Sequence, residues 1–375
     1  YVLIVVLCVY WAATLLNLRG MKTSAGVTKW GTIIGTIVPG AILILLGLGY
    51  WAGGNPILLD MSWDKLVPDM SNFNNLVLAA SIFLFYAGME MSAVHVKDVD
   101  NPGRNYPLAI LISAIITVLI FVLGTLAIGF IIPNSQINLV QSLLITYDSY
   151  FSFFGLGWMN WILALALAVG VLAQVTAWVG GPSKGLYQVG LAGNLPPVMQ
   201  KRNKNNVQMG ILLIQGGIVT LLSIMFVIMP SVQSAYQIIS QLTIILYLIM
   251  YMLMFASGIY LRYREPNTPR TFRIPGGRTF GMWVVGGLGL LASLAAFLVS
   301  FIPPNQITVG SSTMYILLLV AGTFIFAGIP FIIHAMAKPS WKRPVDPEDA
   351  FEPFGWEKNN DSHSTATPSH TISHE

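Results

Sequence analysis

Long apolar runs alternate with short polar segments along this chain. A helix that crosses the hydrocarbon core of a membrane needs about 20 mainly apolar residues, and nine windows approach that length. Each window predicts a membrane span. The predicted spans are residues 1–17, 28–49, 76–97, 107–132, 157–181, 207–229, 235–261, 281–302 and 312–337.

The composition agrees with this pattern. Of the 375 residues, 55% are hydrophobic and only 9% are charged, and the mean hydropathy is +0.70, whereas soluble domains carry about 25% charged residues. Cys8 is the only cysteine, and the five histidines show no metal-ligand spacing. We therefore expect an all-α polytopic membrane protein with no metal, no cofactor, no enzymatic activity and no nucleic-acid partner.

Basic residues predict the orientation of the spans. Eighteen of the 19 lysines and arginines lie on alternate loops or in the C-terminal tail, and Lys65 is the exception. Short loops rich in these residues stay in the cytoplasm, so we expect the first span to start outside and the C-terminus to lie inside. Tyr1 already stands in an apolar run with no signal-peptide pattern, and we expect further spans upstream of it.

The C-terminal segment, residues 339–375, has a different character. It contains seven acidic residues, and its last part is polar and biased in composition. His363, His370 and His374 all lie there, and histidine is the side chain that changes charge near neutral pH. A disordered tail and a functional segment both fit this composition.

Glu90 is the acidic residue that the span pattern does not place in a loop, at a span end or in the tail. It stands in "SIFLFYAGMEMSAVHVKDVDNP", residues 81–102, two positions after Gly88. A carboxylate at membrane depth is costly unless it faces a cavity or finds a partner. A helix-end glutamate in interfacial water is one interpretation. A broken helix that lines a polar pathway is the interpretation that the neighbouring glycine favours.

Aromatic residues form a second group of candidates. Trp178 lies beside Gly180 and Gly181, and Tyr247 and Tyr251 are four residues apart and so share a helix face. Such residues are also common as interfacial anchors. Within the spans, Gln174 and Gln241 are the other conspicuous polar residues, and an interhelical hydrogen bond is one interpretation of each.

Several of these stretches resemble the amino acid–polyamine–organocation superfamily of transporters. "FLFYAGMEMSAVHVKDVDNPGRNYPLA" (83–109) is similar to the signature of its sixth helix. Three further segments, 18–27, 185–208 and 264–277, are similar to its cytoplasmic loops. The resemblance covers 1–338 and implies a leucine-transporter-like fold, with a five-plus-five inverted repeat and twelve helices. The nine spans would then be helices four to twelve, without the N-terminal helices that complete the site.

The resemblance also implies roles for individual residues. It assigns substrate-binding or gating positions to Leu84, Phe85, Tyr86 and Gly88, and a proton-responsive carboxylate to Glu90.

On the later helices, the resemblance places Trp178 where an aromatic ring closes over the substrate. Tyr247 and Tyr251 match tenth-helix site positions more loosely.

The charged tail resembles that of the bacterial glutamate/γ-aminobutyrate antiporters of acid resistance. This implies an inner-membrane exchanger of extracellular glutamate for intracellular γ-aminobutyrate, linked to a cytoplasmic glutamate decarboxylase. It also implies that residues 341–375 form a pH-dependent plug, with His363, His370, His374 and Glu90 as pH sensors. A proton-coupled permease, or an exchanger of other amino acids, is the alternative. No catalytic constellation in the sequence favours a membrane enzyme, and no large folded soluble domain favours a sensor.

Overall fold

The computed structural model describes residues 1–62, 86–138, 141–268, 272–277, 279–304 and 311–343, together with positions 69, 71, 75, 77, 79, 82 and 270. All regular secondary structure in these residues is helical. The α-helices are α1 (Val2–Leu18), α2 (Met21–Thr32), α3 (Val38–Ala52), α6 (Pro102–Ile131), α7 (Ser142–Phe153), α8 (Asn160–Val189), α9 (Met209–Ser223), α10 (Met225–Ile228), α11 (Val232–Arg264), α12 (Phe280–Val299) and α13 (Ser312–Ala335). Short π or 3₁₀ turns are η1 (Ile33–Ile37), η2 (Met89–Asp98), η3 (Asn134–Gln136), η4 (Gly157–Met159), η5 (Gly190–Asn194) and η6 (Pro339–Trp341).

Seven helical stretches of the described chain are long and apolar enough to cross a membrane. They are Lys22–Ala52, Pro102–Ile131, Gly157–Asn194, Met209–Ile228, Val232–Arg264, Phe280–Val299 and Ser312–Ala335, and each coincides with one predicted span. The predicted first span corresponds to α1, which is apolar but has only 17 residues. The class prediction of an all-α polytopic protein is therefore confirmed.

One detail agrees with a local sequence prediction and one was not predicted. The predicted span 76–97 is interrupted at Gly88, where the backbone turns and continues as η2, as the interpretation of a broken helix expects. Helix α7 was not predicted as an element. It has 12 residues, too few to cross a membrane, and it buries Tyr147, Tyr150 and Phe151 against α3, α6 and α8.

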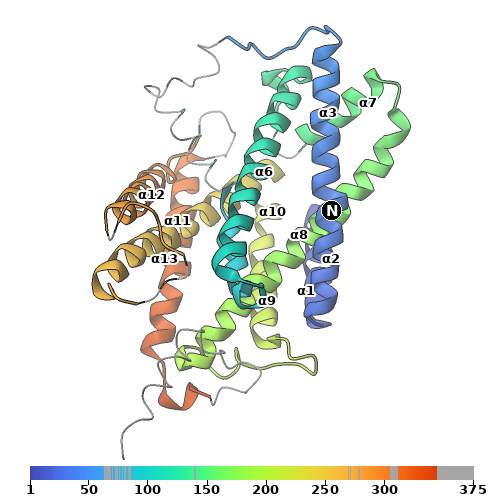
Figure 1. The fold of residues 1–375 in the computed structure, drawn as a ribbon. Helices are drawn as coiled ribbons and strands as arrows, with labels where there is room; N and C mark the ends of the chain where they lie inside the picture. The colour runs from blue at the N-terminus through green and yellow to red at the C-terminus, as the bar shows by residue number, and fades with distance from the viewer. Residues whose placement is uncertain are drawn as a thin grey trace, which may run out of the picture.

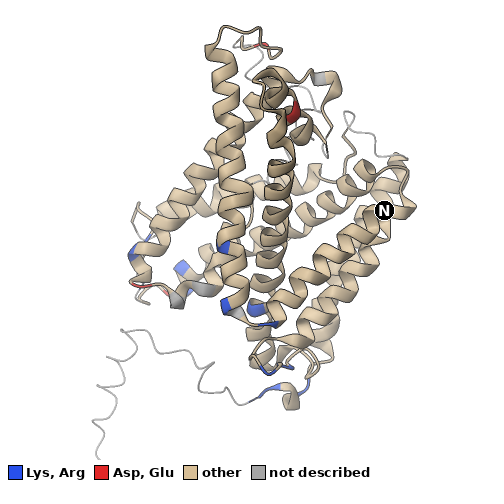
Figure 2. Cartoon of the chain, turned by 90° about the vertical axis from the view of Figure 1, so that its right-hand side faces the viewer, with Lys and Arg blue, Asp and Glu red and all other residues tan. Residues whose placement is uncertain are grey.

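Helix α8 organises one side of the molecule. In Figure 1 it runs obliquely from beside α7, past α3 and α2, toward the lower left of the view. Its partners include α1, α2 and α9, while α11 packs against α12 and α13. In Figure 2 the lysines and arginines of the described chain gather in the lower half of the view.

Close backbone contacts fix α8 in place. Gly170 lies so near the π turn η1 that a Cβ on Gly35 would come within 2.2 Å of the Gly170 Cα. Farther along, the buried Asn17 side chain of α1 donates from Nδ2 to the Thr176 carbonyl at 2.9 Å. Small residues and buried amides of this kind hold membrane helices together. They set the position of the next turn of α8, which carries Trp178.

Loop 195–208 ties several elements together where α8 ends. Asn203 donates from Nδ2 to the Leu18 carbonyl of α1 at 2.6 Å. Gln200 is buried and donates from Nε2 to the Trp341 carbonyl at 2.9 Å. We call residues 338–343, which follow α13 and include Trp341, the tail root.

Candidate functional site

The site is built on the helix break at Gly88. This residue has φ 109° and ψ −8°, a left-handed conformation that glycine adopts without the penalty a Cβ brings. At this turn the Gly88 N–H donates to Oε2 of Glu90 at 3.1 Å. The break therefore presents a backbone donor and a carboxylate side by side.

A second donor reaches the same carboxylate from α11. The Tyr251 hydroxyl donates to Oε2 of Glu90 at 2.9 Å, across 161 positions of sequence. The other oxygen, Oε1, is buried and has no hydrogen-bond partner among the described residues. Because buried polar atoms are nearly always paired, this oxygen marks a place for a proton or for a donor group of a ligand.

Aromatic rings surround the break. The Trp178 ring of α8 lies against Gly88, where a Cβ would come within 2.7 Å of Trp178 Cζ2. The centroids of Trp178 and Tyr247 are 6.1 Å apart, and those of Tyr247 and Tyr251 are 5.7 Å apart, both edge to face. We call Gly88, Glu90, Trp178, Tyr247 and Tyr251 the break cluster.

The structure thus brings together five of the residues singled out in the sequence, although their role in transport stays a prediction. Trp178 is 43% exposed, so its ring is not enclosed by the described residues. Tyr86 is directed to α6 instead, with its ring 5.7 Å from that of Phe121. Leu84, Phe85, His363, His370 and His374 lie outside the described residues.

Two further side chains make contacts in the structure. The sequence left the role of the first undecided and did not single out the second. Gln174 makes the interhelical hydrogen bond that was one interpretation of it, from Nε2 to Thr36 Oγ1 at 2.9 Å. Phe255 was missed, and its ring extends the aromatic row with a centroid 6.3 Å from that of Tyr251. The spacing of Tyr247, Tyr251 and Phe255 at four-residue intervals is the signal that would have found it.

This arrangement suits binding more than covalent chemistry. A half-buried carboxylate with one unpaired oxygen can accept a proton or an ammonium group, and the flanking rings can attract a cation by their faces. Among the described residues, no group of three or more His, Cys, Asp or Glu side chains is placed to hold a metal ion.

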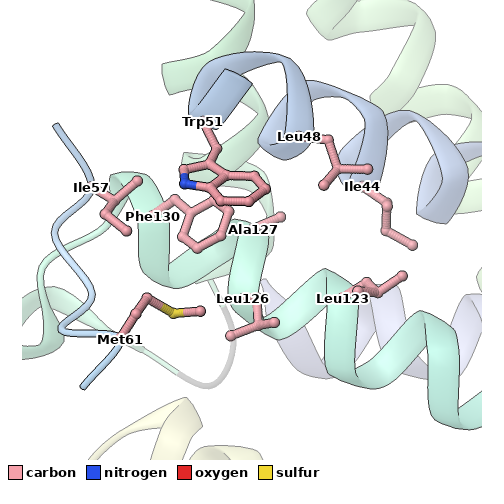
Figure 3. Close-up of a pocket in the computed structure, with 9 residues that line it drawn as sticks. All are labelled: Ile44, Leu48, Trp51, Ile57, Met61, Leu123, Leu126, Ala127 and Phe130. Carbon is pink, nitrogen blue, oxygen red and sulfur yellow. The ribbon is translucent and has the colours of Figure 1, made fainter. Parts of the chain in front are cut away.

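A separate cavity lies between α3 and α6, with a volume of about 300 Å³. Figure 3 shows the rings of Trp51 and Phe130 and the side chain of Leu126 directed into it, and its other lining side chains are also apolar. No member of the break cluster lines it. An apolar cavity cannot pair the charges of a zwitterion, so the break cluster is the better candidate for a polar solute.

One consequence of the geometry can be measured at Tyr251. We expect Tyr251→Phe, which removes only the hydroxyl that donates to Glu90, to lower transport by about tenfold, the scale of a hydrogen bond to a charged group. Initial uptake rates in proteoliposomes would show it. Tyr260→Phe on the same helix is the control, because the Tyr260 hydroxyl contacts Arg264 and not the break. Equal losses of transport in Tyr251→Phe and Tyr260→Phe would contradict a role for the Tyr251 hydroxyl at the break.

Seven membrane-length helices in the described chain define a multi-pass membrane protein, and a carboxylate at a helix break among aromatic rings is typical of solute transporters. The chain belongs to the amino acid permease family, whose family model matches residues 1–326. The expectation of that superfamily from the sequence is confirmed.

Three relatives show which transporters this chain is similar to. An uncharacterized transporter of Legionella pneumophila is 36% identical over 88% of this chain and 71% of its own length. A glutamate/gamma-aminobutyrate antiporter of Lactococcus lactis is 32% identical over 88% of this chain and 66% of its own. A probable agmatine/putrescine antiporter of Lactococcus lactis is 23% identical over 73% and 58%. The chain therefore spans about two thirds of the length of the first two relatives.

Proposed function

We propose that the whole protein is an amino acid antiporter of a bacterial inner membrane that exchanges extracellular glutamate for intracellular γ-aminobutyrate by alternating access. The observation that carries the proposal is the Glu90 carboxylate, held at the Gly88 break with one oxygen unpaired. The similarity to a protein named as a glutamate/gamma-aminobutyrate antiporter supports this substrate pair.

The break cluster fits the chemistry that the two amino acids share. Both carry an ammonium group, which the unpaired Oε1 of Glu90 is suited to accept. Their aliphatic chains are short enough to lie against the rings of Trp178 and Tyr247. A discontinuous helix of this kind exposes backbone groups that bind the charged ends of a substrate near the middle of the membrane.

The proposed exchange accounts for a role in acid resistance. A glutamate side chain titrates near pH 4.3, so acid conditions outside favour its less charged form as cargo. A glutamate decarboxylase in the cytoplasm would consume a proton and supply γ-aminobutyrate for export. The basic loops support a cytoplasmic C-terminus, with 1–338 as the transport domain and 339–375 as a cytoplasmic tail.

Counter-substrate dependence tests the proposal directly. Full-length protein in proteoliposomes should take up labelled glutamate when γ-aminobutyrate is enclosed, and uptake should fall to background when it is omitted. Uptake that needs only an inward proton gradient would favour the alternative, a proton-coupled permease. Uptake of another amino acid in preference to glutamate would show an exchanger of different specificity.

Glu90 provides a sharper test of the mechanism. We expect Glu90→Gln to keep exchange measurable, because the amide oxygen can still accept from Gly88 and Tyr251, while the pH dependence becomes flatter. The reason is that glutamine cannot exchange a proton. The measurement is the ratio of the exchange rates at pH 5.5 and pH 7.5. Gln174→Glu is a matched control, which adds a carboxylate one turn from Trp178. An unchanged ratio in Glu90→Gln would remove Glu90 as a proton-responsive group.

A further inference from the structure

A group of exposed aromatic and basic side chains lies where α11 ends and α12 begins. Tyr260 and Tyr263 are each 56% exposed, and Trp283 is 51% exposed. Trp283 donates from Nε1 to the Tyr263 hydroxyl at 2.8 Å, and Arg264 donates to the Tyr260 hydroxyl at 2.7 Å. We call Tyr260, Arg262, Tyr263, Arg264 and Trp283 the α11–α12 rim. These hydrogen bonds orient four of the five rim residues, and the fifth, Arg262, is half-buried.

An apolar stripe leads away from the rim along α12. Leu288, Leu291 and Leu298 are each more than 60% exposed, and their spacing puts them on one side of the helix together with Val284. Helix α12 has 20 residues, a length of about 30 Å, which matches the hydrocarbon core. With α12 across the hydrocarbon core, the rim would stand at one boundary of the membrane and the stripe would face hydrocarbon.

The rim is positively charged. Arg262 and Arg264 belong to it, and the sequence between residues 255 and 290 has five arginines and one acidic residue, Glu265. Arg270 is occupied, because its guanidinium donates to the carbonyls of Leu261, Glu265 and Thr268 and so closes the end of α11. Arg262 and Arg264 lie in the last turn of α11, and Arg264 donates to the Tyr260 hydroxyl.

We infer that the α11–α12 rim binds the headgroup of an anionic phospholipid, with an acyl chain lying along the apolar stripe of α12. Guanidinium groups pair with a phosphate diester through charge-assisted hydrogen bonds. Tyrosine and tryptophan suit the depth of the headgroups, because they combine an apolar ring with a polar tip. The hydrogen bonds already present at Tyr260 and Tyr263 orient these groups before a lipid arrives, which lowers the ordering cost of binding.

Lipid binding to the purified full-length protein tests the inference without any transport assay. Phosphatidylglycerol and phosphatidylcholine are titrated separately, and bound lipid is counted by native mass spectrometry. The wild type should bind phosphatidylglycerol more tightly than phosphatidylcholine. Arg262→Gln with Arg264→Gln should weaken phosphatidylglycerol binding by about 30-fold, because each basic residue near a membrane surface contributes about fivefold.

The control removes two charges from another basic segment. Lys22→Gln with Lys29→Gln acts on α2, where Lys29 Nζ lies 5.5 Å from the exposed ring of Trp30. If the rim is the binding site, this change should alter the affinity by no more than about twofold, because neither lysine belongs to the rim. Arg262→Lys with Arg264→Lys keeps the charge and should restore most of the binding, which separates loss of charge from misfolding. Equal affinity of the wild type for the two lipids, or equal losses in the rim and α2 variants, would overturn the inference.

Discussion

Replacing Gly88 with alanine is expected to abolish exchange by the full-length protein, with a fall in initial rate of about a hundredfold, equivalent to about 2.7 kcal/mol. Two effects add at this position. A residue with a Cβ resists the left-handed conformation at φ 109° by about 1–2 kcal/mol. The new Cβ would also stand 2.7 Å from Cζ2 and 2.9 Å from Cη2 of Trp178, so the indole or the break must move. Either movement disturbs the contacts between Gly88, Glu90 and Tyr251.

Matched variants separate these two effects. Gly181→Ala is the control, because a Cβ there would meet only Met91 Cε, at an ordinary 3.8 Å, and exchange should stay near the wild-type rate. Combining Gly88→Ala with Trp178→Phe removes the larger ring and should recover part of the activity if the clash dominates. Proteoliposome exchange, normalised to the amount of inserted protein, is the measurement. A Gly88→Ala protein with wild-type exchange would show that the break does not serve transport.

The sequence predicts much of the fold because membrane spans depend on local composition. Apolar windows such as 107–132 and 312–337 correspond closely to α6 and α13, since hydrocarbon requires every backbone group to be paired within the helix. The discontinuity at Gly88 was also indicated locally, by a glycine beside a carboxylate. Helix α7 was not indicated by the sequence, because its 12 residues bury aromatic rings against other helices and show no membrane-length apolar run.

The site was harder to predict because its contacts join distant segments. Glu90 was singled out by its cost in a membrane, but the hydrogen bond to Tyr251 depends on where η2, which packs against α6 and α8, lies relative to α11. The approach of Trp178 to Gly88 likewise follows from the glycine contact of α8 with η1 and the Asn17 hydrogen bond. No periodicity in the sequence encodes these distances. Tyr86 shows the opposite case, because it stands next to the break in sequence but its ring contacts Phe121 of α6.

The tail root decides where a truncation should begin. The sequence placed the proposed plug at residues 341–375, but the Trp341 carbonyl accepts from Gln200, and Lys342 lies against Gly193, where a Cβ would come within 3.0 Å of Lys342 Cβ. Deleting these residues would disturb loop 195–208, which also holds α1 through Asn203. A deletion that starts at residue 344 preserves the root and removes only the segment beyond it.

Deletion of residues 344–375 is expected to extend exchange to neutral pH, raising the rate at pH 7.5 about tenfold while the rate at pH 5.5 changes little. The deleted segment has seven acidic residues, one lysine and three histidines. At neutral pH its negative charge should draw it to the basic loops around the proposed cytoplasmic entrance. In acid, protonation of His363, His370 and His374 adds up to three positive charges, which weakens that attraction and shifts the population toward an open entrance.

Two further proteins distinguish charge from bulk in this prediction. Changing His363, His370 and His374 together to glutamine keeps the tail negative in acid, so the pH at which exchange begins should fall. A Gly/Ser segment of equal length in place of 344–375 should behave like the deletion, because it carries no charge to attract. Glutamate exchange measured from pH 4.5 to 8 in proteoliposomes compares all four proteins. If the deletion keeps the wild-type pH profile, the tail is not the gate, and the flattened profile expected for Glu90→Gln would place the pH sensor in the membrane.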